Sequence, residues 1–134
     1  EKGTFIILDV DKFKEVNDHY GHAVGDIVLS TLGQTLRNYF RENDIIGRIG
    51  GDEFGVIMKN IQTKDIAMKK AEELLAKTQA YKIDELKGNN ISISIGISTA
   101  PQDGDCYMDL YKRADQALYQ AKRSGKARVC NYFS

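Results

Sequence analysis

The fold is decided by the stretch Arg48-Ile49-Gly50-Gly51-Asp52-Glu53-Phe54, which joins two short apolar runs at residues 45–49 and 54–58. A Gly-Gly pair between apolar runs predicts a β-hairpin, because glycine adopts the positive φ angles of tight turns without steric cost. Adjacent aspartate and glutamate repel each other in a plain turn, but they suit a place where a cation and a phosphate approach bare backbone. Two interpretations stay open from the turn alone: an ordinary hairpin with solvated acids, and a cation and phosphate site.

The composition is that of one domain without a strongly charged surface. The chain has 134 residues, 42% of them hydrophobic, which is enough for one core and too few for two, so residues 1–134 are expected to form a single domain. Its 19 basic and 19 acidic residues balance, which argues against a nucleic-acid partner. Two cysteines, Cys106 and Cys130, stand in no metal-ligand spacing and fit a reducing, cytoplasmic location.

The sequence contains no apolar run near the ~18 residues needed to span a bilayer and no signal peptide. It opens directly on a predicted strand, so we expect it to be cut from a longer protein.

The first predicted strand, residues 4–10, ends in two acids. Its continuous apolar run is typical of a buried central strand, and it runs into Asp9-Val10-Asp11. Side chains alternate along a strand, so Asp9 and Asp11 point the same way. Asp11 precedes Lys12-Phe13-Lys14 and is expected to cap a helix over residues 12–19. Asp9 belongs to a strand whose other residues favour burial, and a carboxylate there favours a metal ligand.

The spacing of apolar residues predicts the remaining elements. A second helix begins at or is capped by Asp26 and runs to about residue 40. Thr63 caps a third helix that ends near residue 81, with an inner face of Ile66, Ala67, Ala71, Leu74 and Leu75. Strands follow at residues 91–98 and 127–132, on either side of a helix at 108–124. The order β-α-α-β-β-α-β-α-β, with a central hairpin, predicts an α/β sandwich with a mixed central sheet flanked by helices.

Several polar residues also have ordinary structural interpretations. Asn17 suits a helix C-terminus, and His22 suits a loop. Residues 41–44, Arg-Glu-Asn-Asp, read as a solvated turn. Basic residues after the last helix complement its dipole, although this explains Arg123 better than it explains Lys122 and Lys126 on either side of Gly125.

The chain resembles the GGDEF domain family, the catalytic domains of diguanylate cyclases, in motifs that run in order along nearly its whole length. The hairpin carries Gly50-Gly51-Asp52-Glu53-Phe54. The opening strand and helix carry Asp9-Val10-Asp11-Lys12-Phe13-Lys14-Glu15-Val16-Asn17-Asp18, followed by Tyr20-Gly21-His22 and Gly25-Asp26. Later segments carry Ser92-Ile93-Ser94-Ile95-Gly96-Ile97-Ser98 and Ala114-Asp115-Gln116-Ala117-Leu118-Tyr119-Gln120-Ala121-Lys122. The family's usual N-terminal helix and Asp-Leu-Thr-Gly-type segment are absent from this sequence.

This resemblance implies a nucleotidyl-cyclase-like fold and the condensation of two GTP molecules into cyclic di-GMP, with release of two pyrophosphates. Each domain would hold one GTP, and two domains would face each other as a transient homodimer. Each 3′-hydroxyl would attack the α-phosphorus held by the other copy. Phosphoryl transfer of this kind depends mainly on charge neutralisation and in-line positioning. Such domains are usually fused to a sensory or regulatory domain.

The resemblance also implies a metal site with two Mg²⁺ or Mn²⁺ ions. Its ligands would be Asp9, Asp52 and the backbone carbonyl of Val10, with Glu53 close to a metal. Asp52 is the residue most often given the role of base in the family. A carboxylate that already binds a metal has a lowered pKa and is a weak base, however.

For GTP, the resemblance implies contacts with the base and with the phosphates. Asn17 and Asp26 would read the guanine edge, and His22 and Phe13 would complete the base contacts. Gly50 and Gly51 would let the triphosphate lie against bare backbone beside Arg48. The lysines Lys14, Lys122 and Lys126 would neutralise phosphate charge. The family usually has arginine at the position of Lys126 and asparagine at that of Ala127, so we expect weaker phosphate binding here.

Within the family pattern, Arg41 and Asp44 resemble an Arg-x-x-Asp site for feedback inhibition by the product. Arg41 would hold a guanine and a phosphate of cyclic di-GMP, and Asp44 would hold a guanine edge. A second basic residue from a neighbouring surface usually completes this site, and Lys69 and Lys70 are the candidates.

Three other functions compete with this interpretation. One is a silent domain that binds GTP as a regulatory module, against which the intact Asp9, Asp52 and Glu53 argue. Another is a receptor that binds cyclic di-GMP through Arg41 and Asp44 without turnover. A third is a cyclase that acts on a single triphosphate, against which the guanine-reading and hairpin motifs argue.

Overall fold

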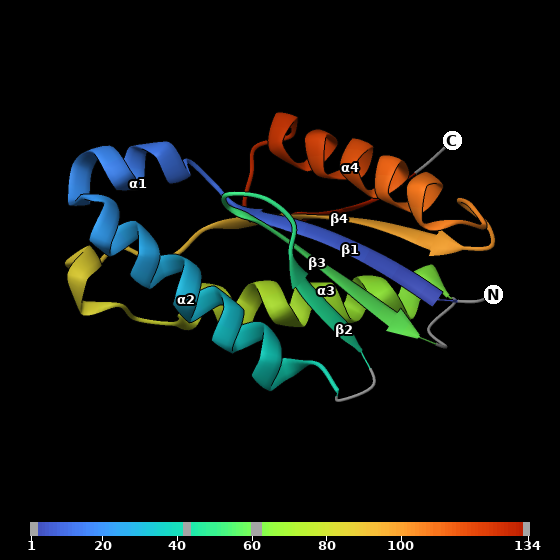
Figure 1. Ribbon diagram of the computed structural model, residues 1–134, viewed down its shortest axis with the longest axis horizontal. Helices are drawn as coiled ribbons and strands as arrows, with labels where there is room; N and C mark the ends of the chain where they lie inside the picture. The colour runs from blue at the N-terminus through green and yellow to red at the C-terminus, as the bar shows by residue number, and fades with distance from the viewer. Residues whose placement is uncertain (1–2, 42–43, 60–62, 133–134) are drawn as a thin grey trace.

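The computed structural model describes residues 3–41, 44–59 and 63–132. Its centre is a five-stranded sheet in the order β2-β3-β1-β4-β5 (Figure 1). The strands are β1 (Gly3–Val10), β2 (Ile45–Arg48), β3 (Glu53–Lys59), β4 (Ile93–Ala100) and β5 (Val129–Asn131). All neighbours pair antiparallel except β4 and β5, which are parallel, so the predicted mixed sheet is confirmed.

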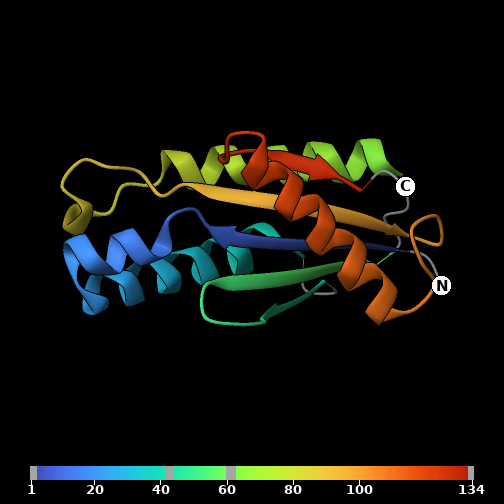
Figure 2. The same cartoon turned by 90° about the horizontal axis from the view of Figure 1, so that it is seen from above.

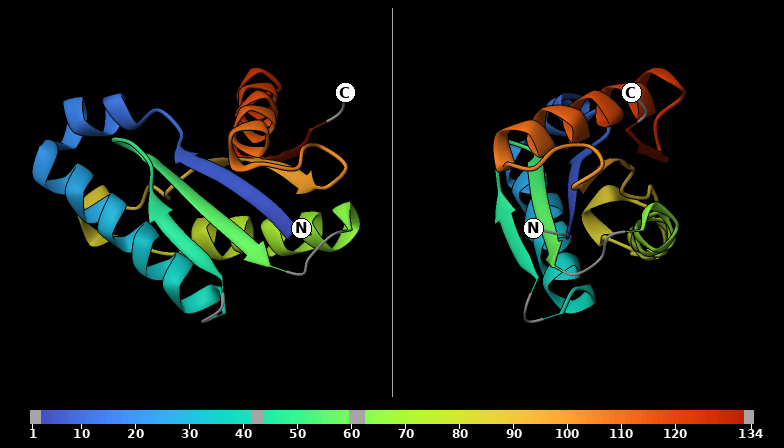
Figure 3. Two further views of the ribbon diagram at one scale, coloured as in Figure 1. Left: turned by 45° about the vertical axis from the view of Figure 1, so that its right-hand side comes forward. Right: turned by 90° about the vertical axis from the view of Figure 1, so that its right-hand side faces the viewer.

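The helices cover both faces of this sheet, as Figure 2 and the two views of Figure 3 show. They are α1 (Phe13–Tyr20), α2 (His22–Tyr39), α3 (Lys64–Ala80) and α4 (Tyr107–Arg123), with a short 3₁₀ helix η1 (Asp84–Leu86) before β4. Helices α2 and α3 pack on one face, and α4 packs on the other. The predicted order of strands and helices is confirmed, with η1 as an addition.

Strand β1 is buried on both faces, and its alternation determines where its acids point. Ile6, Leu8 and Val10 face the core under α2 and α3, whereas Phe5 and Ile7 face α4. Asp9 continues the row of Phe5 and Ile7, so the same alternation carries its side chain to the α4 side of the sheet.

Helix α4 lies unusually close to the sheet at Gly96 of β4. A side chain at this position would collide with the backbone of α4 at Ala114 and Leu118. Because only glycine fits, the backbone of α4 can rest on the strand. This contact holds the last turn of α4, with Lys122, near the end of β1 that carries Asp9.

The predicted hairpin is confirmed. Strands β2 and β3 pair from Ile45 opposite Ile57 to Arg48 opposite Phe54. The Ile49 N–H donates to the Glu53 carbonyl at 2.8 Å, which closes the turn around the two glycines. Beyond the turn, β3 pairs with β1 in a register that sets Glu53 directly opposite Asp9.

Three local predictions are wrong. Asp11 does not cap α1, because Lys12 holds the N-cap position in a left-handed conformation (φ 55°) without a side-chain hydrogen bond. Helix α2 begins at His22, directly after Gly21 (φ 94°), so His22 is helical and Asp26 lies in the second turn. Thr63 does occupy the predicted N-cap position of α3, although its side chain makes no capping hydrogen bond. Ile66 is 49% exposed, whereas the buried residues of α3 are Ala67, Ala71, Leu74 and Thr78.

Among the described helices, none has the length and apolar character needed to cross a membrane.

Candidate active site

Three segments that are distant in sequence meet at one end of the sheet. The end of β1 brings Asp9 and Asp11, the β2–β3 turn brings Asp52 and Glu53, and the last turn of α4 brings Lys122. Figure 1 shows the turn beside the C-terminal end of β1, in agreement with the pairing of Asp9 with Glu53. Lys122 Nζ lies 2.7 Å from Asp9 Oδ1 and 3.3 Å from Asp11 Oδ1. The structure therefore brings together the predicted Asp9, Asp52, Glu53 and Lys122.

Asp9 is a carboxylate with unmet bonding capacity. Its Oδ1 is buried and has no hydrogen bond within the described part of the chain, so the approach of Lys122 is an ion pair rather than a well-formed hydrogen bond. Burial raises the pKa of Asp9 to about 6, an effect that Lys122 opposes and that the negative charges of Asp52 and Asp11 reinforce. A buried acceptor oxygen of this kind fits a cation ligand.

Glu53 is held on the α4 side of the sheet by Tyr111, whose hydroxyl donates to Glu53 Oε1 at 3.0 Å. Burial raises the pKa of Glu53 more than this hydrogen bond lowers it, and the charges of Asp115 and Asp52 add to the rise. Burial and Glu53 together raise the pKa of Tyr111 to about 12. Tyr111 was not predicted as a site residue.

The acids at this end of the sheet fit a divalent cation chemically, but they do not form a closed cage. The negative charge of Asp52 adds to the rise in the pKa of both Asp9 and Glu53, and hard cations such as Mg²⁺ prefer carboxylate oxygens. Within the described residues, however, these three carboxylates do not all come within 4.8 Å of one another. Val10, whose carbonyl is the fourth predicted ligand, is the buried last residue of β1.

The raised pKa of Asp9 predicts a pH dependence of metal binding. A carboxylate must be ionised to bind a metal, so protons compete with the metal below the pKa of Asp9. We expect metal affinity to be nearly constant above pH 7 and to fall about tenfold per pH unit well below pH 6. Titration with Mn²⁺ between pH 5 and 8 measures this. An affinity that is flat down to pH 5 would contradict it.

Asp11 has a structural role that the sequence did not reveal. Its Oδ2 accepts hydrogen bonds from Ser92 Oγ at 2.6 Å and from the Ala127 N–H at 3.0 Å, and its Oδ1 accepts from Ser94 Oγ at 2.6 Å. Burial alone raises the pKa of Asp11, but these hydrogen bonds and Lys122 lower it overall. Asp11 therefore links the end of β1, the entry to β4 and the loop after α4.

The loop after α4 presents Lys126 in a constrained conformation. Gly125, Lys126 and Ala127 all have positive φ, at 128°, 64° and 51°. Residues with a Cβ disfavour this region by roughly 1 kcal/mol each, so the loop needs external support. The Lys126 N–H donates to the Ala121 carbonyl at 3.0 Å, and the Ala127 N–H donates to Asp11. These two bonds fix the backbone of the loop that carries Lys126.

A polar cleft of about 670 Å³ opens between α2 and the β2–β3 hairpin. Its lining includes Asp26, Leu29, Gly33, Arg48 and Phe54. The predicted guanine reader Asp26 and the predicted substrate contact Arg48 thus share one cleft. The cleft contains both a carboxylate and an apolar surface, which suits a nucleobase that presents N–H donors and a flat face.

Asn17 and Phe13 of α1 lie against Gly25 of α2, the residue before Asp26. The space above the Gly25 Cα is filled by the Asn17 carboxamide, and Phe13 Cζ lies 3.3 Å from where a Cβ would stand. The predicted pair Asn17 and Asp26 is therefore placed on neighbouring elements. His22 and Lys14 are exposed, at the start of α2 and in the first turn of α1.

Replacement of Gly25 by alanine is expected to displace Asn17. The new methyl group would occupy the position of the carboxamide, although alanine favours the helix by about 1 kcal/mol. If Asn17 contacts guanine, as the family resemblance implies, Gly25→Ala is expected to raise the KM for GTP about tenfold, the effect of one lost hydrogen bond to the base, with little loss of stability. Gly33→Ala, whose methyl has at least 3.5 Å of room, is the matched control for helix propensity in thermal unfolding. An unchanged KM would contradict this account of Asn17.

The glycine turn is open to solvent, and hydrogen bonds from the Arg48 side chain stabilise it. Gly50 and Gly51 are exposed, and no heavy atom lies within 4 Å of a Cβ built on either residue. Arg48 Nε donates to the carbonyls of Gly50 at 3.2 Å and Gly51 at 3.1 Å. The carbonyls therefore point at the guanidinium, and the open side of the turn remains available to a ligand.

Arg41 and Asp44 lie together in the connection between α2 and β2. The Arg41 N–H donates to Asp44 Oδ2 at 3.0 Å, and the Asp44 N–H donates to the Arg41 carbonyl at 2.9 Å. Strand β2 separates this turn from the Gly50–Gly51 turn. The two intervening residues, 42 and 43, lie outside the described residues.

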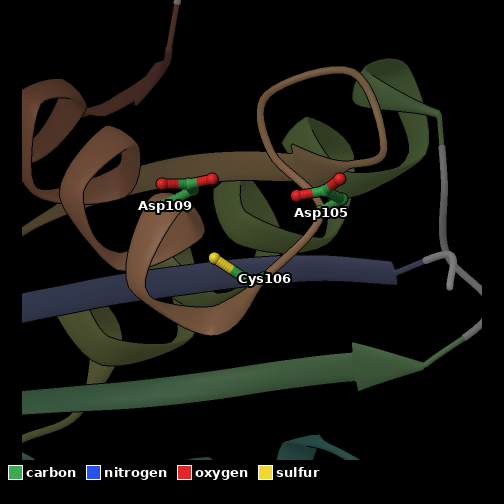
Figure 4. A group of neighbouring side chains, drawn as sticks. All are labelled: Asp105, Cys106 and Asp109. Atoms are coloured by element: carbon green, nitrogen blue, oxygen red, sulfur yellow. The ribbon is translucent and has the colours of Figure 1, made fainter.

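A second group of potential ligand atoms lies at the other end of α4. Figure 4 shows Asp105, Cys106 and Asp109, whose ligand atoms lie within 4.8 Å of one another. All three residues are exposed, and they lie at the start of α4, whereas Lys122 is in its last turn. This group therefore does not belong to the site at the end of β1.

The mixed sheet, the helices on both faces and the acidic end of the sheet beside a polar cleft define an α/β domain of the nucleotidyl-cyclase-like class. The family model described as "Diguanylate cyclase, GGDEF domain" matches residues 1–128. The chain therefore belongs to the GGDEF domain family. This family implies a requirement for a divalent metal.

Individual relatives agree with this assignment. The diguanylate cyclase TpbB of Pseudomonas aeruginosa is 35% identical over 127 residues, which cover 94% of this chain and 29% of that protein. The crystal structure of its GGDEF domain matches with a TM-score of 0.93 and 33% identity over 100% of this chain and 84% of that one. The GGDEF domain of DgcB from Caulobacter crescentus, solved in complex with c-di-GMP, matches with a TM-score of 0.88 and 27% identity over 97% of this chain and 77% of that one. The chain thus spans less than a third of the length of TpbB.

Proposed function

We propose that this domain condenses two GTP molecules into cyclic di-GMP and releases two pyrophosphates, with one GTP held by each of two facing copies. The observation that carries the proposal is the meeting of Asp9, Glu53 and Lys122 at the end of a central strand, beside a cleft lined by Asp26 and Arg48. Membership of the GGDEF family supports the reaction class.

Asp9 and Asp52 would hold a pair of Mg²⁺ or Mn²⁺ ions, with the Val10 carbonyl as a further ligand and Glu53 nearby. Divalent cations in such a site neutralise phosphate charge and lower the pKa of the attacking hydroxyl. The buried Oδ1 of Asp9, whose charge is met by the ammonium of Lys122 alone among the described residues that the ion pairs join, favours this role because it already holds a cation. Glu53, fixed by Tyr111, would add negative charge from the opposite strand.

Guanine would be read by Asp26 and Asn17. A carboxylate accepts from the N1 and N2 protons of guanine, whereas adenine offers no matching pair of donors, so Asp26 selects GTP over ATP. Asn17, packed against Gly25, would pair with O6 or N3. Phe13 and His22 would lie beside the base.

The triphosphate would lie on the open side of the Gly50–Gly51 turn, with its charge neutralised by lysines from several segments. Lys122 and Lys126 come from the end of α4 and the loop that Asp11 supports, and Lys14 comes from α1. Phosphoryl transfer needs this neutralisation more than it needs a strong base. We assign Asp52 the role of base that the family resemblance implies. Its carboxylate would lie close to the attacking 3′-hydroxyl and accept its proton.

Two copies are needed because one domain presents one cleft with one GTP. The 3′-hydroxyl held by one copy would attack the α-phosphorus held by the other, and the second bond would form in the reciprocal sense. The new bond at each phosphorus replaces the bond to pyrophosphate. In the full-length protein, further domains would control how often two copies meet.

Product identity tests the proposal. The domain is incubated with GTP and Mg²⁺, and the nucleotides are identified by mass spectrometry, with ATP as the control substrate. The proposal predicts cyclic di-GMP from GTP and no corresponding product from ATP. A 3′,5′-cyclic mononucleotide would indicate a cyclase acting on one triphosphate. Tight binding of GTP or of cyclic di-GMP without turnover would indicate a regulatory module or a receptor, and would contradict the proposed enzyme.

Feedback inhibition through Arg41 and Asp44 is a separate part of the proposal. The two residues are held in one turn by reciprocal hydrogen bonds, away from the glycine turn by the length of β2. Lys69 or Lys70 would complete the site. Arg41→Ala removes charge-assisted hydrogen bonds and is expected to raise the half-inhibitory concentration of cyclic di-GMP by about tenfold or more. Lys59→Ala, which removes an exposed cation at the end of β3, is the charge-matched control. An inhibition curve of Arg41→Ala identical to that of the wild type would contradict this part of the proposal.

A further inference from the structure

We propose that Lys122 is a built-in, displaceable cation: its ammonium occupies the cation position beside Asp9 until a metal–nucleotide complex arrives, and then moves from Asp9 to the triphosphate. This inference rests on the proposed function and adds a regulatory step to it. Metal alone would then bind weakly, and metal and GTP would bind together.

The geometry of Lys122 is that of a substitute ion. Its Nζ lies 2.7 Å from the buried Asp9 Oδ1, the distance of a close ion pair. The Lys122 and Asp9 side chains are 28% and 15% exposed, so water screens their attraction only in part. A cation that binds Asp9 Oδ1 has to compete with this ammonium, because two positive charges in contact with the same carboxylate oxygen repel each other.

Asp11 gives Lys122 a second partner that remains when the first is lost. Asp11 Oδ1 lies 3.3 Å from Lys122 Nζ and is itself fixed by Ser94. The lysine can therefore turn away from Asp9 without leaving the site, and a triphosphate on the open glycine turn offers it a new anion. The arrival of GTP would thus release Asp9 for the metal, and the arrival of the metal would release Lys122 for the phosphates.

This coupling also accounts for the open arrangement of the acids. Asp9, Asp52 and Glu53 do not all lie within 4.8 Å of one another, whereas Lys122 lies against Asp9. In this structure the ammonium of Lys122 from α4 therefore balances the negative charge of the acids, and the acids do not themselves form a complete set of metal ligands.

The test is Mn²⁺ binding without nucleotide, measured on the 134-residue chain at pH 8 from the electron paramagnetic resonance signal of free Mn²⁺. Lys122→Met keeps the length of the side chain and removes the ammonium, so we expect its Mn²⁺ affinity to exceed that of the wild type by about tenfold or more, as for a unit charge removed at contact distance. A non-hydrolysable GTP analogue is expected to raise Mn²⁺ affinity in the wild type by a larger factor than in Lys122→Met.

Three further variants make the outcome specific. Arg123→Met removes one charge from the next residue of α4, an exposed side chain that stacks on Tyr119, and is expected to change Mn²⁺ affinity by no more than about twofold because of solvent screening. Asp9→Asn is expected to weaken binding strongly. Lys122→Gln repeats the test if the methionine variant unfolds.

An Mn²⁺ affinity that is equal or lower in Lys122→Met, together with weakened binding in Asp9→Asn, would overturn the displaceable cation and leave the metal site of the proposed function intact. Mn²⁺ binding that is indifferent to Asp9→Asn would overturn both. Equal increases of the Mn²⁺ affinity in Lys122→Met and Arg123→Met would mean that the loss of any nearby positive charge has this effect. That result would also overturn the inference.

Discussion

The Asp9→Asn variant is expected to lose cyclic di-GMP synthesis by at least about 10³-fold, because an amide cannot neutralise a divalent cation and that interaction contributes several kcal/mol to phosphoryl transfer. Its fold is expected to be as stable as the wild type at pH 7, or more stable. The two results together would separate a ligand from a structural residue.

The stability part follows from the sign of the pKa change. The pKa of Asp9 rises from 3.8 in a model peptide to about 6 in the fold. Between these values the native state binds more protons than the unfolded state, so stability declines as pH rises through this window. At pH 7 the wild type carries the cost of an ionised, partly buried carboxylate, and asparagine removes that cost. The ion pair with Lys122 offsets part of this gain.

Product formation and thermal unfolding of the same preparation are the measurements. Asp65→Asn, an exposed acid in the first turn of α3, is the control and is expected to change neither quantity. If Asp9→Asn retained activity within tenfold of the wild type, the assignment of Asp9 as a metal ligand would be wrong. Loss of activity together with a large loss of stability would instead indicate a structural role.

The Asp11→Ala variant, unlike Asp9→Asn, is expected to lose stability. We expect a loss of about 3 kcal/mol in the free energy of unfolding at pH 7. The side chain of Asp11 is 3% exposed, and its carboxylate accepts from two hydroxyls and one backbone N–H in addition to pairing with Lys122. Its removal leaves these donors without their partner, and it releases the strained loop of Lys126 and Ala127. We also expect weaker GTP binding, since this loop carries Lys126.

At acidic pH, the free energies of unfolding of Asp11→Ala and the wild type should differ less than at pH 7. The pKa of Asp11 is lowered in the fold, so its contribution is present above the unfolded value of 3.8 and is lost as pH falls through the lower folded value. Denaturant unfolding at pH 7 and below pH 3 measures the change. The variants Ser92→Ala and Ser94→Ala, each of which removes one of the donors, are expected to cost about 1 kcal/mol. A cost below about 1 kcal/mol for Asp11→Ala at pH 7 would contradict the anchoring role.

The features that could be predicted from sequence depend on short-range patterns. The hairpin followed from two glycines between apolar runs, and the burial of β1 followed from its unbroken apolar run. The direction of Asp9 followed from strand alternation. Each of these depends on residues within a few positions of one another, where backbone geometry alone limits the outcome.

The role of Asp11 could not be predicted from local patterns because its partners are distant in sequence. Ser92 lies 81 positions away and Lys122 lies 111 positions away. A position before a helix favours capping, but a tertiary network with three donors and a lysine outcompeted the local cap. Tyr111, 58 positions from Glu53, was missed for the same reason. The alternating serines at 92 and 94, opposite the end of β1, were the signal that a polar partner lies there.

The start of α2 was misplaced because Asp26 looks like an N-cap, whereas Gly21 already ends α1 and lets the next helix begin at His22. The correction affects the proposed site directly. As a residue of the second helical turn, Asp26 projects from the side of α2 into the cleft rather than from its end.

The most direct test of the central claim is the dependence of cyclic di-GMP formation on protein concentration at saturating GTP and Mg²⁺. If each copy holds one of the two reacting GTP molecules, the rate per domain must rise in proportion to concentration while dimers are scarce, and then level off. Cyclic di-GMP formed at a rate per domain that rises in this way is the result we predict. A rate per domain that is constant over a hundredfold range of concentration down to the nanomolar range would contradict the reaction between two facing copies.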